Sequence, residues 1–270
     1  QFCNDSGGVI DDLLVYHLGN HYMLVVNASN IEKNFEWLSS KLIDDVSLED
    51  KSDSIALLAL QGPLSRTHLK KLYPKIEDLK YYETFLPDNN EVIVARTGYS
   101  GELGFEIYAP NSIILKLWNE ILSLSDDILP VGLGCRDSLR LEMGYCLYGN
   151  ELNEQTTTIE AGLSWITKHE TSFIGSNSMQ DNLPSKKLIA LISEERAIPR
   201  SGYKIFSKDK IEVGVVTSGG MSPCLKKGIA LAYVDYEMRL DKEFLIGIRD
   251  NFFIFEKTKL PFYKDGTYLK

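Results

Sequence analysis

The sequence predicts a mixed α and β fold, of class α+β, that ends in a separate all-β unit. Strand-like blocks alternate with blocks at helical spacing over the first two thirds of the chain. From about Lys186 onward only short strand-like runs remain. The 270 residues are 44% hydrophobic and 25% charged, which is an ordinary globular composition. Such a length suggests about two domains or one large one.

The first forty residues predict a hairpin followed by a helix. Residues 13–18 and 22–27 are rich in β-formers and flank a Gly-Asn-His turn, which is typical of a hairpin. Ser29 followed by Glu32 resembles a capping box at the start of a helix over about 30–43. Apolar residues recur in this helix at Ile31, Phe35, Leu38 and Leu42. We expect this apolar side to pack against the hairpin.

The middle of the chain predicts a second layer of strands and helices. Residues 55–60 form a buried-strand run that stops at Gln-Gly-Pro, and a helix-permissive stretch continues to residue 72. Residues 91–97 and 104–108 are two further strands joined by a glycine-bearing turn. Residues 111–122 follow a proline and carry apolar residues at helical spacing, so they predict an amphipathic helix.

The C-terminal part predicts a small sandwich or barrel of Greek-key type, and periodicity does not decide between the two. The boundary falls in the polar stretch 176–187. The expected strands cover residues 188–192, 203–206, 212–217, 228–234, 245–248 and 252–255.

Composition argues against several classes of function. A net charge of -9 is a poor match for the phosphate backbone of nucleic acids. The longest apolar runs fall well short of the roughly 20 residues that a transmembrane helix needs. The four cysteines form no CxxC pair, which argues against a zinc cluster and favours a reducing compartment. Neither HExxH, a Walker A loop, a G-x-S-x-G elbow nor a GxGxxG fingerprint is present.

Two adjacent aspartates interrupt the apolar run SGGVIDDLLVY. If one strand runs through this segment, Asp12 and Tyr16 share a face and lie roughly 13 Å apart, a spacing that suits an elongated ligand. One of the two carboxylates must then point somewhere unusual. The alternative is that Asp11 and Asp12 cap a turn after the preceding pair of glycines.

Glu106 alternates with apolar neighbours in GFEIY and therefore faces away from the apolar side, beside Tyr108. A strand carboxylate in this position is most often solvated. The functional alternative is that it accepts hydrogen bonds from a planar N–C–N donor edge, as carboxylates do from guanidinium groups.

Arg136 and Arg140 lie four residues apart in GCRDSLRLEMGY, with Asp137 and Glu142 beside them. The simplest interpretation is a helix face with salt bridges, and a ligand-binding arginine is the alternative. Tyr145 and Trp165 would be core aromatics by default.

Taken in order, several strings of this sequence resemble the aminomethyltransferase family, the T-protein of the glycine cleavage system. The resemblance runs over essentially the whole chain. The strings that carry it are NDSGGVIDDLLVY, LVVNASNIEKNF, ALLALQGP, RTGYSGELGFEIY, GLGCRDSLRLEMGYCLYGNEL, GLSWITK and GVVTSGGMSPCLKKGIALAYV.

The resemblance implies a three-domain cloverleaf around a channel, with a ferredoxin-like domain and a C-terminal all-β jelly-roll-like barrel. Residues 1–53 would be the second half of the ferredoxin-like folate-binding domain, and 54–148 an α+β domain one. Residues 149–187 would return to the folate-binding domain, and 188–270 would form the barrel. Family members carry a further region ahead of NDSGGVIDDL, so we expect the chain to be N-terminally incomplete.

The resemblance also implies roles for eight residues. Asp12 matches the family's catalytic aspartate. Residues that match folate-binding positions are Tyr16, Tyr99, Glu106, Arg136, Tyr145, Trp165 and, across a gap, Tyr268.

The implied reaction moves the one-carbon unit of an aminomethyl group to tetrahydrofolate, releases ammonia and forms 5,10-methylenetetrahydrofolate. The donor is the dihydrolipoyl arm of H-protein, and no metal takes part. Expected partners are lipoylated H-protein and tetrahydrofolate, with neither nucleic acid nor membrane. We expect a monomer in the cytoplasm of a bacterium or the mitochondrial matrix of a eukaryote.

Three alternatives stay open. One is another tetrahydrofolate-dependent methyl or methylene transferase of the same fold. Another is a non-catalytic folate-binding protein, whose KGCYxGQ-type motif is replaced here by TSFIGSNSM. The third is a purely structural role for an inactive, truncated copy.

Overall fold

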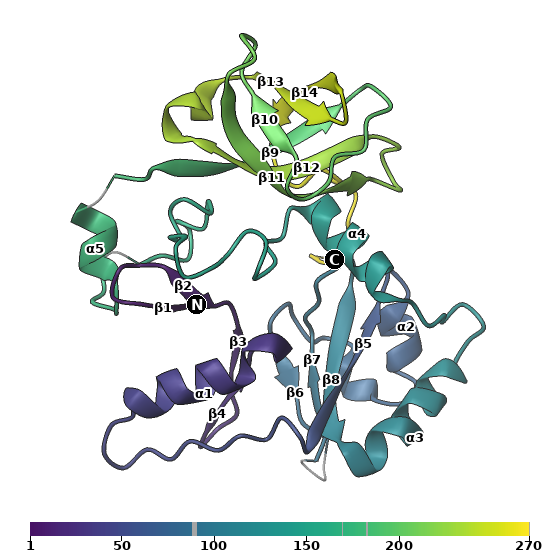
Figure 1. Cartoon of the computed structure of the whole chain (residues 1–270). Helices are drawn as coiled ribbons and strands as arrows, with labels where there is room; N and C mark the ends of the chain where they lie inside the picture. Colours follow the sequence, from purple (N-terminus) through teal and green to yellow (C-terminus); the bar gives the residue numbers. More distant parts are fainter. Residues whose placement is uncertain (88–90, 169, 182, 270) are drawn as a thin grey trace. The chain divides into compact units, whose positions relative to one another are not determined.

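The structure, a computed structural model, describes residues 1–87, 91–168, 170–181 and 183–269. These residues form two compact units that are built from non-contiguous segments. The first unit comprises residues 1–34 and 141–263, and the second comprises 35–140 and 264–270. Figure 1 labels the elements of both units.

The first unit begins with two short antiparallel pairs of strands. β1 (Phe2–Cys3) pairs with β2 (Val9–Asp11), and β3 (Leu14–His17) pairs with β4 (Tyr22–Val25). The second pair confirms the hairpin predicted from the sequence. Gly19 in its turn has φ +81°, a left-handed conformation that glycine adopts without steric cost.

Helix α1 (Ile31–Ser40) confirms the predicted helix but ends earlier than expected. A 3-10 turn (Ala28–Asn30) precedes it in place of the expected capping box. The expected packing of its apolar side is wrong, because Phe35 is exposed and Asn34 is buried. The physical reason is a buried carboxylate that takes the amide of Asn34, as described below.

The second unit contains a four-stranded antiparallel sheet with the order β5-β8-β7-β6. Its strands are β5 (Ile55–Gln61), β6 (Thr84–Phe85), β7 (Ile93–Ala95) and β8 (Gly104–Pro110). The strands expected over 55–60 and 104–108 are thus confirmed, and the one expected over 91–97 is present but shorter. Strand β8 is an inner strand, and its residues from Gly104 to Ala109 are buried.

Helices complete the second unit. They are α2 (Ser65–Leu69), the 3-10 turn η2 (Pro74–Ile76) and α3 (Asn111–Leu122), which confirms the predicted helix. α3 packs on β5 and β8. Helix α4 (Leu133–Met143) runs from the second unit into the first. The core of the unit is built from Leu69, Ile76, Val92, Val94, Phe105, Ile107, Ala109, Leu117 and Ile121.

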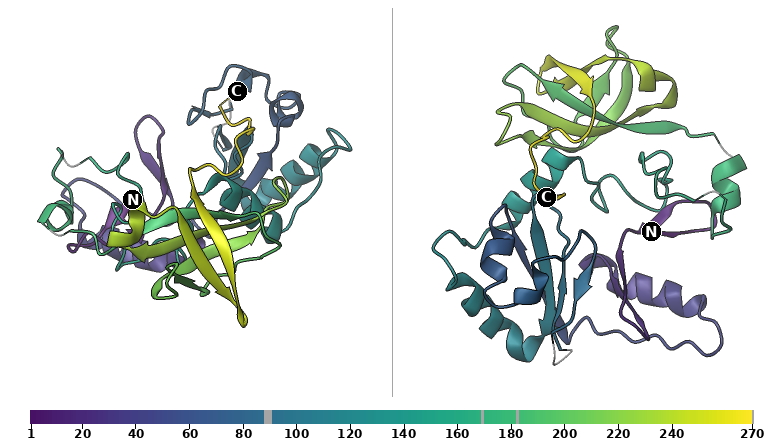
Figure 2. Two further views of the ribbon diagram at one scale, coloured as in Figure 1. Left: turned by 90° about the horizontal axis from the view of Figure 1, so that it is seen from above. Right: turned by 180° about the vertical axis from the view of Figure 1, so that it is seen from behind.

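The C-terminal part of the first unit is a closed six-stranded antiparallel barrel with the order β10-β11-β12-β9-β14-β13. Figure 2 shows it from two further directions. The result decides between the sandwich and barrel alternatives in favour of the barrel. The strands are β9 (Lys186–Ser193), β10 (Lys204–Phe206), β11 (Glu212–Met221), β12 (Gly228–Asp235), β13 (Glu243–Ile248) and β14 (Asn251–Thr258).

Two short helices adjoin the barrel strands in the sequence. α5 (Ser176–Asp181) precedes β9, and the 3-10 turn η3 (Tyr236–Leu240) follows β12. Large apolar side chains such as Leu191, Phe244 and Phe255 fill the barrel core without solvent exposure. Over the described residues, none of the helices is both long and apolar enough to cross a bilayer.

Candidate functional site

The segment with the two aspartates does not form one continuous strand. β2 ends at Asp11 and pairs with β1, whereas β3 begins at Leu14 and pairs with β4. The expected strand through Asp12 and Tyr16 is therefore wrong, because the chain changes its pairing partner between them. Side-chain alternation cannot be carried across such a break.

The alternative role of the aspartates as turn caps is also wrong. The turn before β2 is capped by Asn4, whose Oδ1 accepts the backbone N–H groups of Ser6 at 3.0 Å and Gly8 at 2.9 Å. An asparagine that accepts these N–H groups leaves both aspartates available for other contacts.

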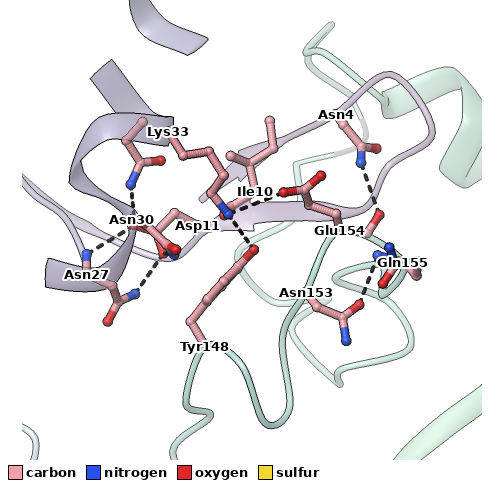
Figure 3. Close-up of polar contacts among 11 residues, drawn as sticks. Asn4, Ile10, Asp11, Asn27, Asn30, Lys33, Tyr148, Asn153, Glu154 and Gln155 are labelled. Carbon is pink, nitrogen blue, oxygen red and sulfur yellow. Dashed lines mark hydrogen bonds and ion pairs between the residues drawn. The ribbon is translucent and has the colours of Figure 1, made fainter. Parts of the chain in front are cut away.

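Asp11 lies in a cage of three asparagines and has no exposed surface. Its Oδ1 accepts the side-chain amides of Asn27 at 2.8 Å and Asn30 at 2.7 Å. Its Oδ2 accepts the amide of Asn34 at 2.5 Å and the backbone N–H of Asn27 at 3.1 Å. Figure 3 shows part of this cage. Four donors satisfy both oxygens, which is what a buried carboxylate requires.

Asp12 has a different environment from its neighbour. It is half-buried, and its Oδ1 accepts the Asn27 amide at 2.8 Å. No other residue in the described parts of the chain donates a hydrogen bond to Oδ2 of Asp12. Burial raises the pKa of the Asp12 carboxyl above its ordinary value, and the negative charge of Asp11 adds to this, while the Asn27 hydrogen bond opposes it. Asp12 is therefore a carboxylate with one open oxygen and an enhanced affinity for a proton or a cation.

Lys33 of α1 fixes the segment that carries these aspartates. Its Nζ donates to the backbone oxygen of Ile10 at 2.8 Å and to the Tyr148 hydroxyl at 2.6 Å (Figure 3). It also forms an ion pair with Glu154 at 3.3 Å. Burial alone would lower the pKa of Lys33, but the contacts with Tyr148 and Glu154 raise it. One ammonium group thus ties β2 and α1 to residues 148–154.

Among the described residues, the side-chain hydrogen bond to Asp12 comes from Asn27 and not from the other expected residues of the first unit. Tyr16 is 4% exposed and Tyr145 is half-buried. Trp165 is 71% exposed, so the default expectation of a core aromatic is wrong for this residue. A large exposed aromatic side chain is available to a ligand or a partner.

Glu106 on β8 is only 5% exposed, so the expectation of a solvated carboxylate is wrong. Its Oε2 accepts the hydroxyls of Thr97 at 2.6 Å and Tyr108 at 3.1 Å, which confirms its predicted place beside Tyr108. Its neighbours across the sheet are the small residues Ala59 and Ala95. No donor to Oε1 occurs among the described residues. The carboxylate therefore offers this oxygen to an external donor.

Gln61 organises the loop before β8. Its Nε2 donates to the carbonyls of Thr97 at 3.1 Å and Phe105 at 3.4 Å, and its Oε1 accepts the Ser100 hydroxyl at 2.7 Å. A Cβ atom on Gly98 or Gly104 would overlap the Gln61 amide. The glycines of TGYSGELG therefore serve the close approach of this glutamine, and the arrangement fixes the backbone around residue 99.

Tyr99 and Arg136 meet in the second unit. The Arg136 guanidinium carbon lies 4.8 Å from the centre of the Tyr99 ring, within the range of a cation–π contact. Arg140 instead pairs with Asp137 at 2.7 Å. The salt-bridge interpretation is thus confirmed for Arg140 and wrong for Arg136, which is exposed and forms no ion pair within the described residues.

Tyr268 belongs to the same unit and lies beside the glycine loop. Its backbone N–H donates to the carbonyl of Gly101 at 3.3 Å, and its own carbonyl accepts Arg96 Nη2 at 3.1 Å. Its ring contacts Tyr81 edge-on, with the ring centres 5.7 Å apart. Tyr268, which matches a folate-binding position only across a gap in the sequence, thus lies next to the loop that carries Tyr99.

The eight predicted residues are divided equally between the two units. Tyr99, Glu106, Arg136 and Tyr268 belong to the second unit, and the other four belong to the first. Among the residues that the structure describes, no group of three His, Cys, Asp or Glu side chains could hold a metal ion.

Sequence reasoning missed the residues that surround Glu106 and those that surround Asp11 and Asp12. Those around Glu106 are Gln61 and Thr97, and those around the aspartates include Lys33 and the three asparagines. The asparagines carried a signal, because Asn27, Asn30 and Asn34 are spaced by three and four residues and therefore share one side of a helical turn.

Comparisons with known proteins give a consistent result. The family model of the GCVT N-terminal domain matches residues 1–171, and that of the glycine cleavage T-protein C-terminal barrel domain matches residues 186–264. An aminomethyltransferase of Flavobacterium psychrophilum is 42% identical over 272 residues, which cover 97% of this chain and 76% of the relative. One of Halothermothrix orenii is 44% identical over 271 residues, which cover 96% of this chain and 76% of the relative.

A solved structure agrees with these relatives. The crystal structure of glycine cleavage system aminomethyltransferase T from Bartonella henselae matches with a TM-score of 0.90 and 31% identity, over 99% of this chain and 76% of that one. With both family models matched and identities of 42% and 44% over nearly the whole chain, the chain belongs to the glycine cleavage T-protein family.

Proposed function

We propose that this chain is an aminomethyltransferase that passes a one-carbon unit from an aminomethyl group on dihydrolipoyl H-protein to tetrahydrofolate. The products are ammonia and 5,10-methylenetetrahydrofolate. The observation that carries the proposal is the identity of 42–44% to aminomethyltransferases over 96–97% of the chain. The environments of Asp12 and Glu106 support it.

The reaction exchanges two bonds of one methylene carbon. This carbon loses its bonds to the amine nitrogen and to the lipoyl sulfur, and it gains bonds to N5 and N10 of tetrahydrofolate. The two N–H hydrogens of tetrahydrofolate end on the sulfur and on the released ammonia. The carbon becomes an iminium-like cation as ammonia leaves, so a fixed negative charge beside it lowers the barrier.

Asp12 fits this role through its open oxygen. Oδ1 is held by Asn27, which leaves Oδ2 to accept a hydrogen bond from the attacking folate nitrogen and to stabilise the developing positive charge. The raised pKa of the carboxyl favours this task, because it increases the proton affinity of the group that receives the N–H hydrogen.

The second unit would bind the folate. Glu106 offers Oε1, and the remaining capacity of Oε2, to the N–C–N donor edge of the pterin. Tyr99 and Arg136 present a stacked aromatic ring and guanidinium, a combination that suits a flat ring with an anionic tail. Tyr16, Tyr145, Trp165 and Tyr268 complete the proposed folate contacts.

We also infer the domain architecture, the partners and the location of the chain. The architecture is a three-domain cloverleaf with domain boundaries near residues 53, 148 and 187, in which the C-terminal barrel is of jelly-roll type. We also infer a monomer that meets H-protein transiently, without a metal, nucleic acid or membrane. The location would be the cytoplasm if the source is a bacterium.

The test is a reconstituted assay that contains aminomethylated H-protein, tetrahydrofolate and this chain. We expect ammonia release that depends on tetrahydrofolate and matches the methylenetetrahydrofolate formed. Methyl acceptance by folate without ammonia release would instead indicate another transferase of the same fold. Saturable folate binding without either product would indicate a non-catalytic folate-binding protein.

A further inference from the structure

The amide of Asn27 joins two carboxylates that have different environments. Its Nδ2 lies 2.8 Å from Oδ1 of Asp11, 2.8 Å from Oδ1 of Asp12 and 3.1 Å from the backbone oxygen of Asp12. An amide nitrogen carries two hydrogens, so one is directed to Asp11 and the other is shared by the two Asp12 oxygens. If this amide were reversed, its own oxygen would face both carboxylates, which is electrostatically unfavourable. The orientation of Asn27 therefore depends on the charge of both neighbours.

Asp11 is the fixed member of this arrangement. It has no exposed surface, and Asn30, Asn34 and the backbone N–H of Asn27 hold it from other directions. Asp12 is half-buried, and among the described residues Asn27 is the one other residue that donates a hydrogen bond to its side-chain oxygens. Asp11 and its cage therefore hold the Asn27 amide in place, and the Asn27 amide in turn holds the Asp12 side chain.

The cage is a poor way to gain stability alone. A buried carboxylate loses its hydration, which is costly where no cation pairs with it. In addition, Oδ1 of Asn34 is buried without a hydrogen-bond partner among the described residues, which costs further free energy. An arrangement that retains these costs directly beside an open carboxylate is typical of a positioning network.

We propose that Asp11 is a positioning residue that fixes the Asn27 amide and, through it, the orientation in which Asp12 presents its free oxygen. The inference rests on the proposed function, in which Asp12 contacts the reacting atoms. Asp11 itself, caged on both oxygens, contacts neither substrate.

The first experiment compares the turnover of the full chain with that of Asp11→Asn. The substitution is nearly isosteric, and the unpaired Asn34 oxygen could accept from the new amide after a side-chain flip, so we expect the variant to fold. Turnover should fall about tenfold to hundredfold, as for other second-layer hydrogen-bond partners. Asp44→Asn, at an exposed position, makes the same chemical change and should leave turnover unchanged.

A double-mutant cycle tests whether Asp11 acts through Asp12. If it does, adding Asp11→Asn to Asp12→Asn should cause no further loss of turnover, because the group that is positioned has already gone. Two independent losses that multiply would overturn the proposal. Wild-type turnover in Asp11→Asn would overturn it as well.

The titration of Asp12 gives a readout that does not depend on turnover. The charged side chain that acts on it is Asp11, which raises its pKa, while the backbone N–H of Asp12 lowers it. The Asn27 hydrogen bond lowers the pKa and is a larger influence than the Asp11 charge. Carboxyl ¹³C NMR of Asp11→Asn should therefore show a rise in the pKa of Asp12 if Asn27 loses its orientation. A fall, caused by the lost charge alone, would show that Asn27 holds its place without Asp11.

Asn34→Ala keeps the test decisive if Asp11→Asn does not fold. It removes one of the four donors and leaves the charge of Asp11, so turnover should fall less and the pKa of Asp12 should move in the same direction. Unchanged turnover and titration in this variant would overturn the proposal. If the wild-type chain itself releases no ammonia, the proposed function fails, whereas the NMR titration still reports on the coupling of the two aspartates.

Discussion

Each compact unit holds one of the two proposed site carboxylates, Asp12 or Glu106, and the two are held in different ways. Glu106 sits on an inner strand, is almost fully buried, and receives two neutral hydroxyl donors on one oxygen. Asp12 lies where the chain leaves β2, is half-buried, and has a second carboxylate next to it. The comparison supports our proposal that the sheet provides the folate-binding carboxylate, while the strand end provides a carboxylate whose proton affinity is raised by its surroundings.

We expect the largest effect from the substitution that removes the charge of Asp12. Asp12→Asn keeps the shape and the contact with Asn27 but cannot accept a proton or balance a cation. We expect turnover to fall by about a hundredfold or more, in the range of general acid–base groups, while tetrahydrofolate still binds. Ammonia release measured at saturating folate checks this. Near-normal turnover would contradict a catalytic role for Asp12.

The Glu106 carboxylate should show the opposite balance between binding and turnover. Glu106→Ala removes the acceptor of the pterin donor edge, and hydrogen bonds to a charged group contribute about 1.5–3 kcal/mol. We expect calorimetric titration to show affinity for tetrahydrofolate that is weaker by about tenfold or more. Turnover at saturating folate should change less.

The exposed Glu237 provides a matched control for this experiment, since Glu237→Ala removes a carboxylate far along the sequence in the barrel. Unchanged folate affinity in Glu106→Ala would remove this residue from the binding site. A loss of turnover at saturating folate without a loss of affinity would break the division of roles between the two carboxylates.

The free energy of unfolding should also depend on the charge of Asp12. The pKa of Asp12 is raised in the folded chain, so the folded state binds a proton more tightly than the unfolded state does. As pH rises from the ordinary aspartate pKa through the folded value, the unfolded state ionises first and stability falls. Above this window the loss is constant. Asp12→Asn should therefore be somewhat more stable than wild type at pH 7, and the advantage should vanish below pH of about 4.

Urea unfolding at both pH values measures this difference, and Asp44→Asn is again the control. A less stable Asp12→Asn at pH 7 would mean that the charged Asp12 contributes favourably to the fold. The half-buried carboxylate would then be a group that stabilises the fold.

The elements that sequence reasoning predicted well are those set by local pattern. The hairpin β3–β4 follows from its turn residues, and helix α3 from the spacing of its apolar residues after a proline. The all-β character of the C-terminal part follows from repeated short strands, which did not decide between a sandwich and a barrel. In each case the signal and the element occupy the same stretch of chain.

The elements that were missed depend on distant partners. The break between β2 and β3 reflects pairing with two different strands, which alternation alone does not reveal. The buried side of α1 is set by Asp11, which lies 23 residues before Asn34. The burial of Glu106 arises because β8 is covered on both faces, so that alternation no longer separates core from solvent.

We expect the smallest effect from a substitution of the exposed Arg136, which lies in the same unit as Glu106. Arg136→Lys keeps the positive charge but replaces the planar guanidinium that lies over Tyr99. An exposed cation–π contact is worth about 0.5–1 kcal/mol, so folate affinity should weaken about twofold to fivefold with little change in turnover. Arg196→Lys, at another exposed position, should leave affinity unchanged. Unchanged affinity in Arg136→Lys would mean that the positive charge alone is sufficient at this position, whereas a loss confined to Arg136→Lys would assign the guanidinium contact with Tyr99 to folate binding and leave the chemistry to Asp12.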